Sequence, residues 1–329
     1  MLATFSATLN PMLMLFLCIA VGFILRRCNI FSKDSGKVMA KMVTWVFAPA
    51  ISFCTMARFC TIETIGAHAT NIFLSFCGVI VALTAATLLS KVFVRNKCAE
   101  RGIYAYALAF GNSGYVGDPV VLTMFGEEVL SYYKLFCLPI SIAIYTWGIS
   151  MLVPDGEKKE NPLKKIINAP TVGIFLGIIA GLTGIGQRLP TFLDNSLDAL
   201  KVCMGPTAML LAGVTVANYS IPVMLKKAKV YLATALRLVA LPALIIGILF
   251  AVKTLLASIL HVEIGNNALH FCFFAVAAPL GLNTVVFPEA FGGNPETGAS
   301  MALISHTLCV ISIPLMYALL IALFGPIKL

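Results

Sequence analysis

Long hydrophobic stretches without charged residues alternate with short charged segments along the whole chain. A helix needs about 20 apolar residues to cross the core of a bilayer. The pattern therefore predicts an all-α integral membrane protein with about ten transmembrane helices, the eighth of which is interrupted only by Arg237. The predicted spans cover residues 5–25, 42–57, 69–90, 102–117, 135–153, 166–186, 202–225, 230–252, 267–288 and 297–326.

Basic residues are divided unevenly between the loops that join these spans. Because cytoplasmic loops carry the excess of Lys and Arg, the richer set should be cytoplasmic, which predicts that both termini lie outside. The odd-numbered loops hold Arg26, Arg27, Lys33, Lys37, Lys41, Lys91, Arg95, Lys97, Arg101, Lys158, Lys159, Lys164, Lys165, Lys226, Lys227 and Lys229. The even-numbered loops and the C-terminus hold Arg58, Lys134, Arg188, Lys201, Lys253 and Lys328.

The chain also divides into two halves of five spans each. A Pro-, Gly- and charge-containing segment at 154–165 is typical of a linker, and it separates residues 1–153 from residues 166–329. Helices two and seven each carry one proline, Pro49 and Pro206. Because five is an odd number, the second copy would be inserted upside down, which predicts two inverted five-helix repeats.

Helices four and nine carry the strongest local signal. Helix four places Gly111, Gly114, Gly117 and Pro119 within nine residues, although Gly costs about 1 kcal/mol and Pro about 3 kcal/mol in a helix interior. Unwound backbone is tolerated in a bilayer only where it faces protein or a water-filled cavity. The segment therefore predicts a broken helix that lines a cavity.

Helix nine repeats this combination with Pro279, Gly281 and Asn283, followed by Pro288. If the two breaks cross near the midplane, the new half-helix N-termini would attract a small anion and the freed carbonyls would suit a cation. The alternative is a pair of proline-kinked helices that pack tightly through small residues.

Three polar side chains within or directly beside the spans are candidates for ion coupling. Asp118 at a helix centre costs roughly 2.5–3.5 kcal/mol, so it should face a cavity or a partner, or else meet water near the helix end. Arg237 could pair with Asp118, attract an anion or, as the favoured interpretation, snorkel to the cytoplasmic interface. His306 could shuttle a proton, although a hydrogen-bonded packing role is favoured.

Composition agrees with a membrane protein and excludes other classes. Charged residues make up 11% of the 329 residues, whereas soluble domains carry roughly 25%. The net charge of +9 resides in loops rather than on one face, so no nucleic acid partner is expected. The sequence has no phosphate loop and no metalloprotease or hydrolase motif. We therefore expect no enzyme activity, no metal site and no cofactor.

The segment Gly111-Asn112-Ser113-Gly114-Tyr115-Val116-Gly117-Asp118-Pro119 resembles the G-N-x-G-x-x-G-x-P segment of the auxin efflux carrier family, which includes bacterial malonate permeases. The resemblance extends over essentially the whole chain. It implies ten helices, with broken helices four and nine crossing beside a bound carboxylate. The implied substrate site contains Asn112, Pro119, Pro279 and Asn283, and the neighbouring Gly114, Tyr115 and Gly281 complete the predicted site.

Two departures from the family pattern bear on function. Asp118 stands where the family more often has an apolar residue, and the long cytoplasmic loop of the plant exporters is reduced to about a dozen residues. The short loop favours a bacterial-type permease in the plasma membrane. We expect a secondary transporter of a small organic anion, a carboxylate, working by alternating access in the lipid bilayer.

Several alternatives stay open at this point. Bile acid sodium symporters are relatives of the family, so a sodium- or proton-coupled symporter with Asp118 as ion ligand is one alternative, and a channel or sensor without active transport is another. Plant members imply a homodimer. A stripe formed by Gly173, Gly177 and Gly181 would bring two helices close together, either within the subunit or across such a dimer.

Overall fold

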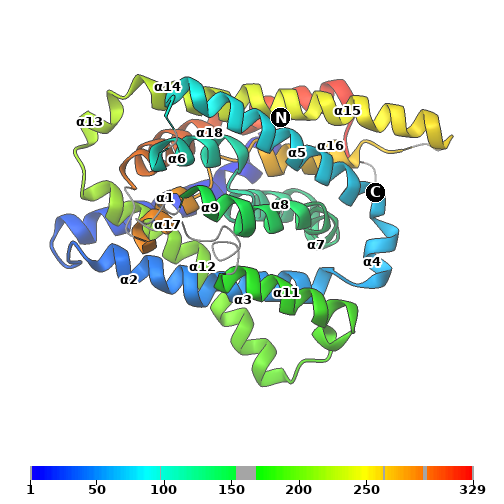
Figure 1. Ribbon diagram of the computed structural model, residues 1–329, viewed down its shortest axis with the longest axis horizontal. Helices are drawn as coiled ribbons and strands as arrows, with labels where there is room; N and C mark the ends of the chain where they lie inside the picture. The colour runs from blue at the N-terminus through cyan, green and yellow to red at the C-terminus, as the bar shows by residue number, and fades with distance from the viewer. Residues whose placement is uncertain (1, 97, 153–167, 262–263, 292–294, 328–329) are drawn as a thin grey trace.

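A computed structural model describes residues 2–96, 98–152, 168–261, 264–291 and 295–327, and all structural statements below concern these residues. Within them the chain is helical apart from connecting segments and one isolated antiparallel bridge (Figure 1). The prediction of an all-α fold is confirmed. The predicted linker at 154–165 lies outside the described residues, and the division into two repeats stays a prediction.

The described helices vary widely in length, and breaks separate many of them from the next. In chain order they are α1 (Leu2–Arg27), α2 (Ser35–Met42), α3 (Ala48–Phe59), α4 (Ile62–Ala67), α5 (Ala69–Phe93), α6 (Ala99–Ala109), α7 (Asp118–Phe136), α8 (Leu138–Ala143), α9 (Ile149–Leu152), α11 (Ala169–Leu182), α12 (Thr191–Ala217), α13 (Ile221–Leu225), α14 (Ala228–Ala235), α15 (Leu241–Leu260), α16 (Asn267–Val276), α17 (Asn283–Phe291) and α18 (Glu296–Phe324). Short π-helical segments join several of them at Val43–Phe47, Ser113–Gly117, Ile144–Gly148 and Leu236–Ala240.

Five described helical spans are long and apolar enough to cross a membrane, and a sixth is obtained if Val129–Phe136 and Leu138–Leu152, bent by 43°, form one span. The predicted count of ten is therefore not confirmed. Breaks divide the predicted fourth and ninth spans into shorter helices, and α11 has only 14 residues. The five spans are Ser35–Phe59, Ala69–Phe93, Thr191–Ala217, Ala228–Leu260 and Glu296–Phe324.

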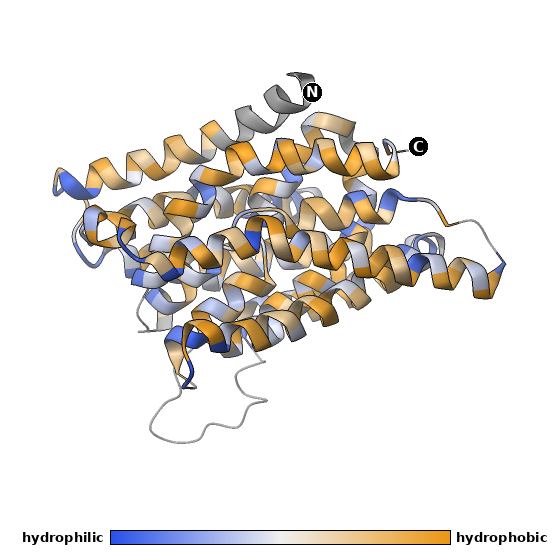
Figure 2. Ribbon diagram, turned by 90° about the horizontal axis from the view of Figure 1, so that it is seen from above, coloured by the Kyte–Doolittle hydropathy of each residue, from blue (hydrophilic) through white to orange (hydrophobic). Residues whose placement is uncertain are grey.

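Hydrophobic residues cover most of the outer helix surface, while hydrophilic residues gather near helix ends (Figure 2). Leu17, Val92 and Leu323, from three different helices, are 66–67% exposed. Soluble proteins rarely expose apolar surface of this extent, because its contact with water is unfavourable. The outer surface is therefore suited to lipid, and the chain is a multi-pass membrane protein.

Two helix pairs pack closely: α1 lies along α12, and α3 lies along α11. The glycine stripe of α11 allows its close contact with α3, because a Cβ atom on Gly173 would lie only 2.5 Å from the carbonyl oxygen of Pro49. The stripe thus brings two helices of one subunit together.

Candidate functional site

The backbone crosses itself where the two predicted breaks meet. Helix α6 ends at Ala109 and α16 ends at Val276, and the segments that follow run antiparallel. The amide of Asn112 donates to the Pro279 carbonyl at 2.7 Å, and the amide of Gly281 donates to the Phe110 carbonyl at 3.2 Å. Each break therefore satisfies backbone groups of the other, which explains how unwound chain is accommodated inside a membrane protein.

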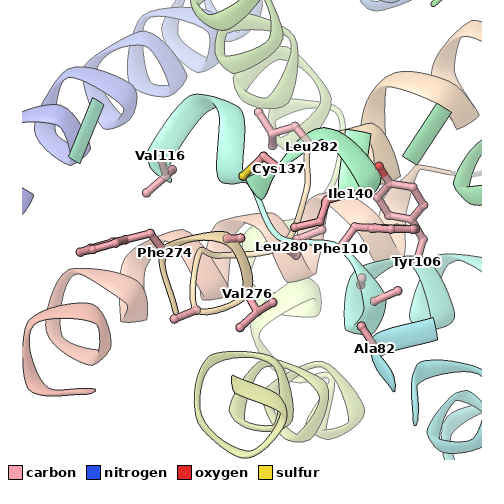
Figure 3. Close-up of a cluster of buried hydrophobic side chains, with 14 of the residues drawn as sticks. Ala82, Tyr106, Phe110, Val116, Cys137, Ile140, Phe274, Val276, Leu280 and Leu282 are labelled. Atoms are coloured by element: carbon pink, nitrogen blue, oxygen red, sulfur yellow. The ribbon is translucent and has the colours of Figure 1, made fainter. Parts of the chain in front are cut away.

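Phe110 and Leu280 lie beside each other at this crossing, among buried side chains contributed by distant parts of the chain (Figure 3). Gly111 is the tightest point. A Cβ atom there would lie 2.0 Å from Nη2 of Arg237 and 2.8 Å from the Ala275 carbonyl oxygen. Glycine is needed at 111 because no other residue leaves room for the second backbone and the guanidinium.

A cavity of about 100 Å³ opens on the other side of the crossing. It is lined by both breaks and by the helices opposite them. Its described lining consists of Ile51, Ser52, Thr55, Met56, Tyr106, Gly111, Asn112, Ser113, Gly114, Asp118, Lys134, Cys137, Ser141, Ile144, Tyr145, Met204, Gly281, Leu282 and Asn283. The predicted cavity beside the breaks is thus present in the structure.

Asn112 is held by His306 of α18, which approaches from outside the cavity lining. The side-chain nitrogen Nδ2 of Asn112 lies 3.1 Å from Nε2 of His306, and Nδ1 of His306 lies 2.9 Å from the Ala302 carbonyl oxygen. A carbonyl oxygen only accepts, so Nδ1 carries the proton and Nε2 accepts from Asn112. The buried histidine therefore fixes the orientation of the amide that lines the cavity.

Asn283, the matching amide of the second break, is held in a similar way. Its Nδ2 donates to the hydroxyl oxygen of Tyr106 at 2.7 Å, and Tyr106 is fully buried in α6. Each break therefore presents one asparagine to the cavity, anchored by a side chain from a different helix. Sequence reasoning did not identify Tyr106, because a tyrosine in an apolar helix gives no signal of its partner.

Asp118 forms an ion pair with Lys134, and each side chain is 18% exposed. The two residues meet because Gly126, midway between them, has a φ of 84°, and the chain reverses there. The sequence predicted an outer loop at this point and counted Lys134 as a loop residue, which is wrong. Residues 118–136 are instead helical on both sides of Gly126, and the reversal brings Lys134 into the cavity wall.

Arg237 does not snorkel, and it does not pair with Asp118; both expectations are wrong. Its side chain is completely buried, and Nη1 donates to the Leu108 carbonyl in the last turn of α6 at 3.2 Å. Its Nε and Nη2 have no hydrogen-bond partner among the described residues. Because a helix C-terminus carries a partial negative charge, the guanidinium is favourably placed at the end of this half-helix.

The remaining predicted site residues are placed unequally. Gly114 and Gly281 line the cavity, and Pro279 contributes its backbone carbonyl to the crossing. The side chains of Tyr115 and Pro119 lie outside the described part of the structure. Within the described residues, no group of three or more His, Cys, Asp or Glu side chains could hold a metal ion.

An all-α membrane protein whose two broken helices cross beside a cavity that mixes polar and apolar side chains has the architecture of a membrane transporter. The chain belongs to the membrane transport protein family, which matches residues 7–317. This match confirms the resemblance to the auxin efflux carrier family.

Two curated proteins show the same relationship. An uncharacterized transporter of Methanocaldococcus jannaschii is 24% identical over 214 residues, which cover 64% of this chain and 69% of the relative. A protein of Rhizobium meliloti named "Putative malonate transporter" is 29% identical over 132 residues, covering 37% of this chain and 40% of the relative. The chain thus matches less than half of the second relative, and both names describe transporters.

Proposed function

We propose that the protein is a secondary transporter that moves a small organic anion, a carboxylate, across the plasma membrane by alternating access. The observation that carries this proposal is the composition of the cavity wall. The helical segments that begin at Ser113 and Asn283 turn their N-terminal ends toward the cavity. The aligned peptide dipoles give the N-terminal end of a helix a partial positive charge, which favours a bound anion.

Side chains of the wall support the same substrate class. Asn112 and Asn283 supply amide groups, Ser52 and Ser141 supply hydroxyls, and Lys134 supplies a positive charge. Apolar residues such as Ile51, Ile144 and Leu282 complete the wall, as expected for a site that holds a small organic molecule. The malonate named for one relative makes short dicarboxylates the first compounds to test.

Alternating access requires one part of the molecule to move against another. The crossing is tied together by backbone hydrogen bonds, whereas the α1–α12 and α3–α11 pairs contribute Ile51, Thr55, Met56 and Met204 to the opposite cavity wall. We propose that these pairs rock relative to the crossing, with both termini outside. Such motion would open the cavity first to one side of the membrane and then to the other.

The test is flux of radiolabelled short mono- and dicarboxylates, beginning with malonate, through proteoliposomes containing the full chain. Uptake into empty vesicles and efflux from loaded vesicles are both measured, with imposed sodium or proton gradients. We expect saturable flux of at least one acid. Flux that rises linearly with concentration would indicate a channel, and no flux of any acid would overturn the proposal.

Variants locate the site. Asn112→Ala and Asn283→Ala should each reduce flux while the protein still folds, because each removes one amide from the cavity wall. Asn195→Ala is the matched control, since Asn195 is an exposed helical residue of α12 outside the cavity. Equal flux in all three variants would contradict the site assignment.

A sodium- or proton-coupled symporter is the second candidate function, and it is favoured by one observation. Asp118 lines the cavity within the same wall as the two asparagines. A carboxylate in this position could carry a proton or ligate a cation during each cycle. The imposed gradients in the flux experiment separate coupled from uncoupled transport.

A further inference from the structure

The charged side chains of the described cavity lining are Asp118 and Lys134, and they are paired with each other. All other described lining residues are neutral. An anion that enters this cavity therefore meets one cation, and that cation already has a partner. This raises the question of what happens to Asp118 when a substrate carboxylate arrives.

We propose that Lys134 is the residue that binds the substrate carboxylate, and that Asp118 is its resident counter-ion, which takes a proton when the substrate displaces it. The inference rests on the proposed function and adds the coupling ion and the residues that carry it. In the empty cavity, Lys134 is bound to ionised Asp118. In the loaded cavity, Lys134 is bound to the substrate carboxylate, and Asp118 is a neutral carboxylic acid holding one proton from solution.

The physical reason is the cost of an unpaired charge in this place. Asp118 is 18% exposed, and removing its partner would leave a largely buried carboxylate uncompensated, which is strongly destabilising. Two carboxylates near one ammonium group also repel each other. A single proton on Asp118 removes both costs, so binding of the acid and of the proton should be linked.

The groups around Asp118 leave no other compensation. Lys201 of α12 contributes positive potential at Asp118, but its own ammonium group lies 2.7 Å from Asp198 and is paired there. Tyr133 and Cys137, which also lie near Asp118, carry no charge at neutral pH. No described carboxylate other than Asp118 lines the cavity and could take the proton instead.

The fold places the exchange where it can affect motion. Asp118 directly follows the π-helical segment Ser113–Gly117 of the first break, whereas Lys134 lies on the returning part of α7 beyond Gly126. The ion pair therefore joins the crossing to the next span. Substrate binding would replace this direct link by one that runs through the bound acid.

The test is binding of malonate to the purified full chain between pH 6.5 and 8.5, followed by uptake in proteoliposomes under an imposed proton gradient. If one proton is taken up with each acid, wild-type affinity should rise about tenfold per pH unit as pH falls. Asp118→Asn should bind malonate more tightly at pH 8, because Lys134 is released. Its affinity should follow only the titration of malonate itself, and its uptake should no longer respond to the proton gradient.

The contribution of Lys134 is read from a double variant, because Lys134→Met alone leaves Asp118 unpaired and could fail to fold. Asp118→Asn with Lys134→Met removes both charges together. Relative to Asp118→Asn, we expect the double variant to lose affinity by about 10- to 100-fold, the value of a charge-assisted hydrogen bond. Equal affinity in these two variants would overturn the role of Lys134.

A matched ion pair outside the cavity serves as control. Nζ of Lys227 lies 2.5 Å from Oε1 of Glu296, and the two side chains are 30% and 29% exposed. The double variant Lys227→Met with Glu296→Gln should leave malonate affinity and its pH dependence unchanged. If the wild type transports malonate and Asp118→Asn keeps the wild-type pH dependence of binding, the inference fails while the proposed function stands. If the wild type neither binds nor transports any short acid, both the inference and the proposed function fail.

Discussion

The two sides of the helix crossing differ in the charge of the helix ends that lie there and in whether a side chain neutralises that charge. On one side, the segments that begin at Ser113 and Asn283 present partially positive N-terminal ends to a cavity. On the other side, α6 ends with a partially negative C-terminus, and Arg237 is buried against its Leu108 carbonyl. The negative end is thus neutralised by a cation of the chain itself, while under the proposed function the positive ends would contact the substrate.

This difference indicates that the two sides of the helix crossing have different roles. The buried Arg237 guanidinium is part of the protein and stays at the helix end, so this side of the crossing is suited to holding the broken helices together. The cavity side holds the Asp118–Lys134 pair and two anchored asparagines, which can exchange partners with a solute. Substitutions on the two sides should therefore have different effects, with folding most affected on one side and solute binding on the other.

The largest expected effect comes from glycines on the two sides of the crossing. Gly111→Ala would place a Cβ atom 2.0 Å from Nη2 of Arg237, whereas Gly281→Ala would meet its nearest atom, on Tyr106, at 3.3 Å. We expect Gly111→Ala to destabilise the protein by about 1–3 kcal/mol or more and to abolish flux.

Gly281→Ala should fold with a small loss of stability. Gly114→Ala should lose no stability, because no atom lies within 4 Å of the added Cβ. Thermal unfolding in detergent and malonate flux measure both properties. Similar losses in Gly111→Ala and Gly114→Ala would contradict the idea that the Arg237 side is the closely packed one.

A smaller effect is expected from changing the charge of Arg237. Arg237→Met leaves the buried Leu108 carbonyl without its donor, which costs about 1–3 kcal/mol, and removes the cation from the helix end. Arg237→Lys keeps the charge and one donor, so it should retain more stability and more flux than Arg237→Met. Equal melting temperatures for the two variants would show that shape, rather than charge, matters at 237.

The smallest expected effect concerns the support of Asn112. His306→Ala removes the acceptor of the Asn112 amide, and a typical hydrogen bond contributes about 0.5–1.5 kcal/mol, or roughly 2- to 10-fold in affinity. We expect a higher KM with nearly unchanged maximal flux. His306→Gln offers an acceptor again and should partly restore the affinity. Equal KM values in His306→Ala and His306→Gln would show that His306 does not position Asn112.

The sequence predicted the helical membrane class, the two breaks and their cavity because Gly and Pro inside apolar helices leave local, readable signals. It did not predict the path of the chain after the first break. Gly126 was one glycine among many, and only its positive φ shows the reversal that brings Lys134 to Asp118. Arg237 was assigned to the interface because snorkelling depends on side-chain direction, which tertiary packing decided.

The number of spans illustrates the same limit. Hydropathy counts apolar residues, so it gave each broken segment as one span, and the predicted breaks did not say where the chain leaves the helix. The structure places these points at Phe110 and after Val276. The partner residues Tyr106 and His306 contact Asn283 and Asn112 across large sequence separations. Such pairings depend on the three-dimensional crossing and have no local pattern.

The crossing has one further consequence, for the evolution of substrate preference. Its two central hydrogen bonds join main-chain atoms of residues 110–112 and 279–281, so among single replacements only proline at Asn112 or Gly281 would remove a donor. Apart from Gly111, where an added Cβ atom has no room, side chains around the crossing can therefore be exchanged one at a time while its backbone hydrogen bonds persist. A lineage built on this framework could acquire new solutes by small mutational steps without first having to invent a new fold.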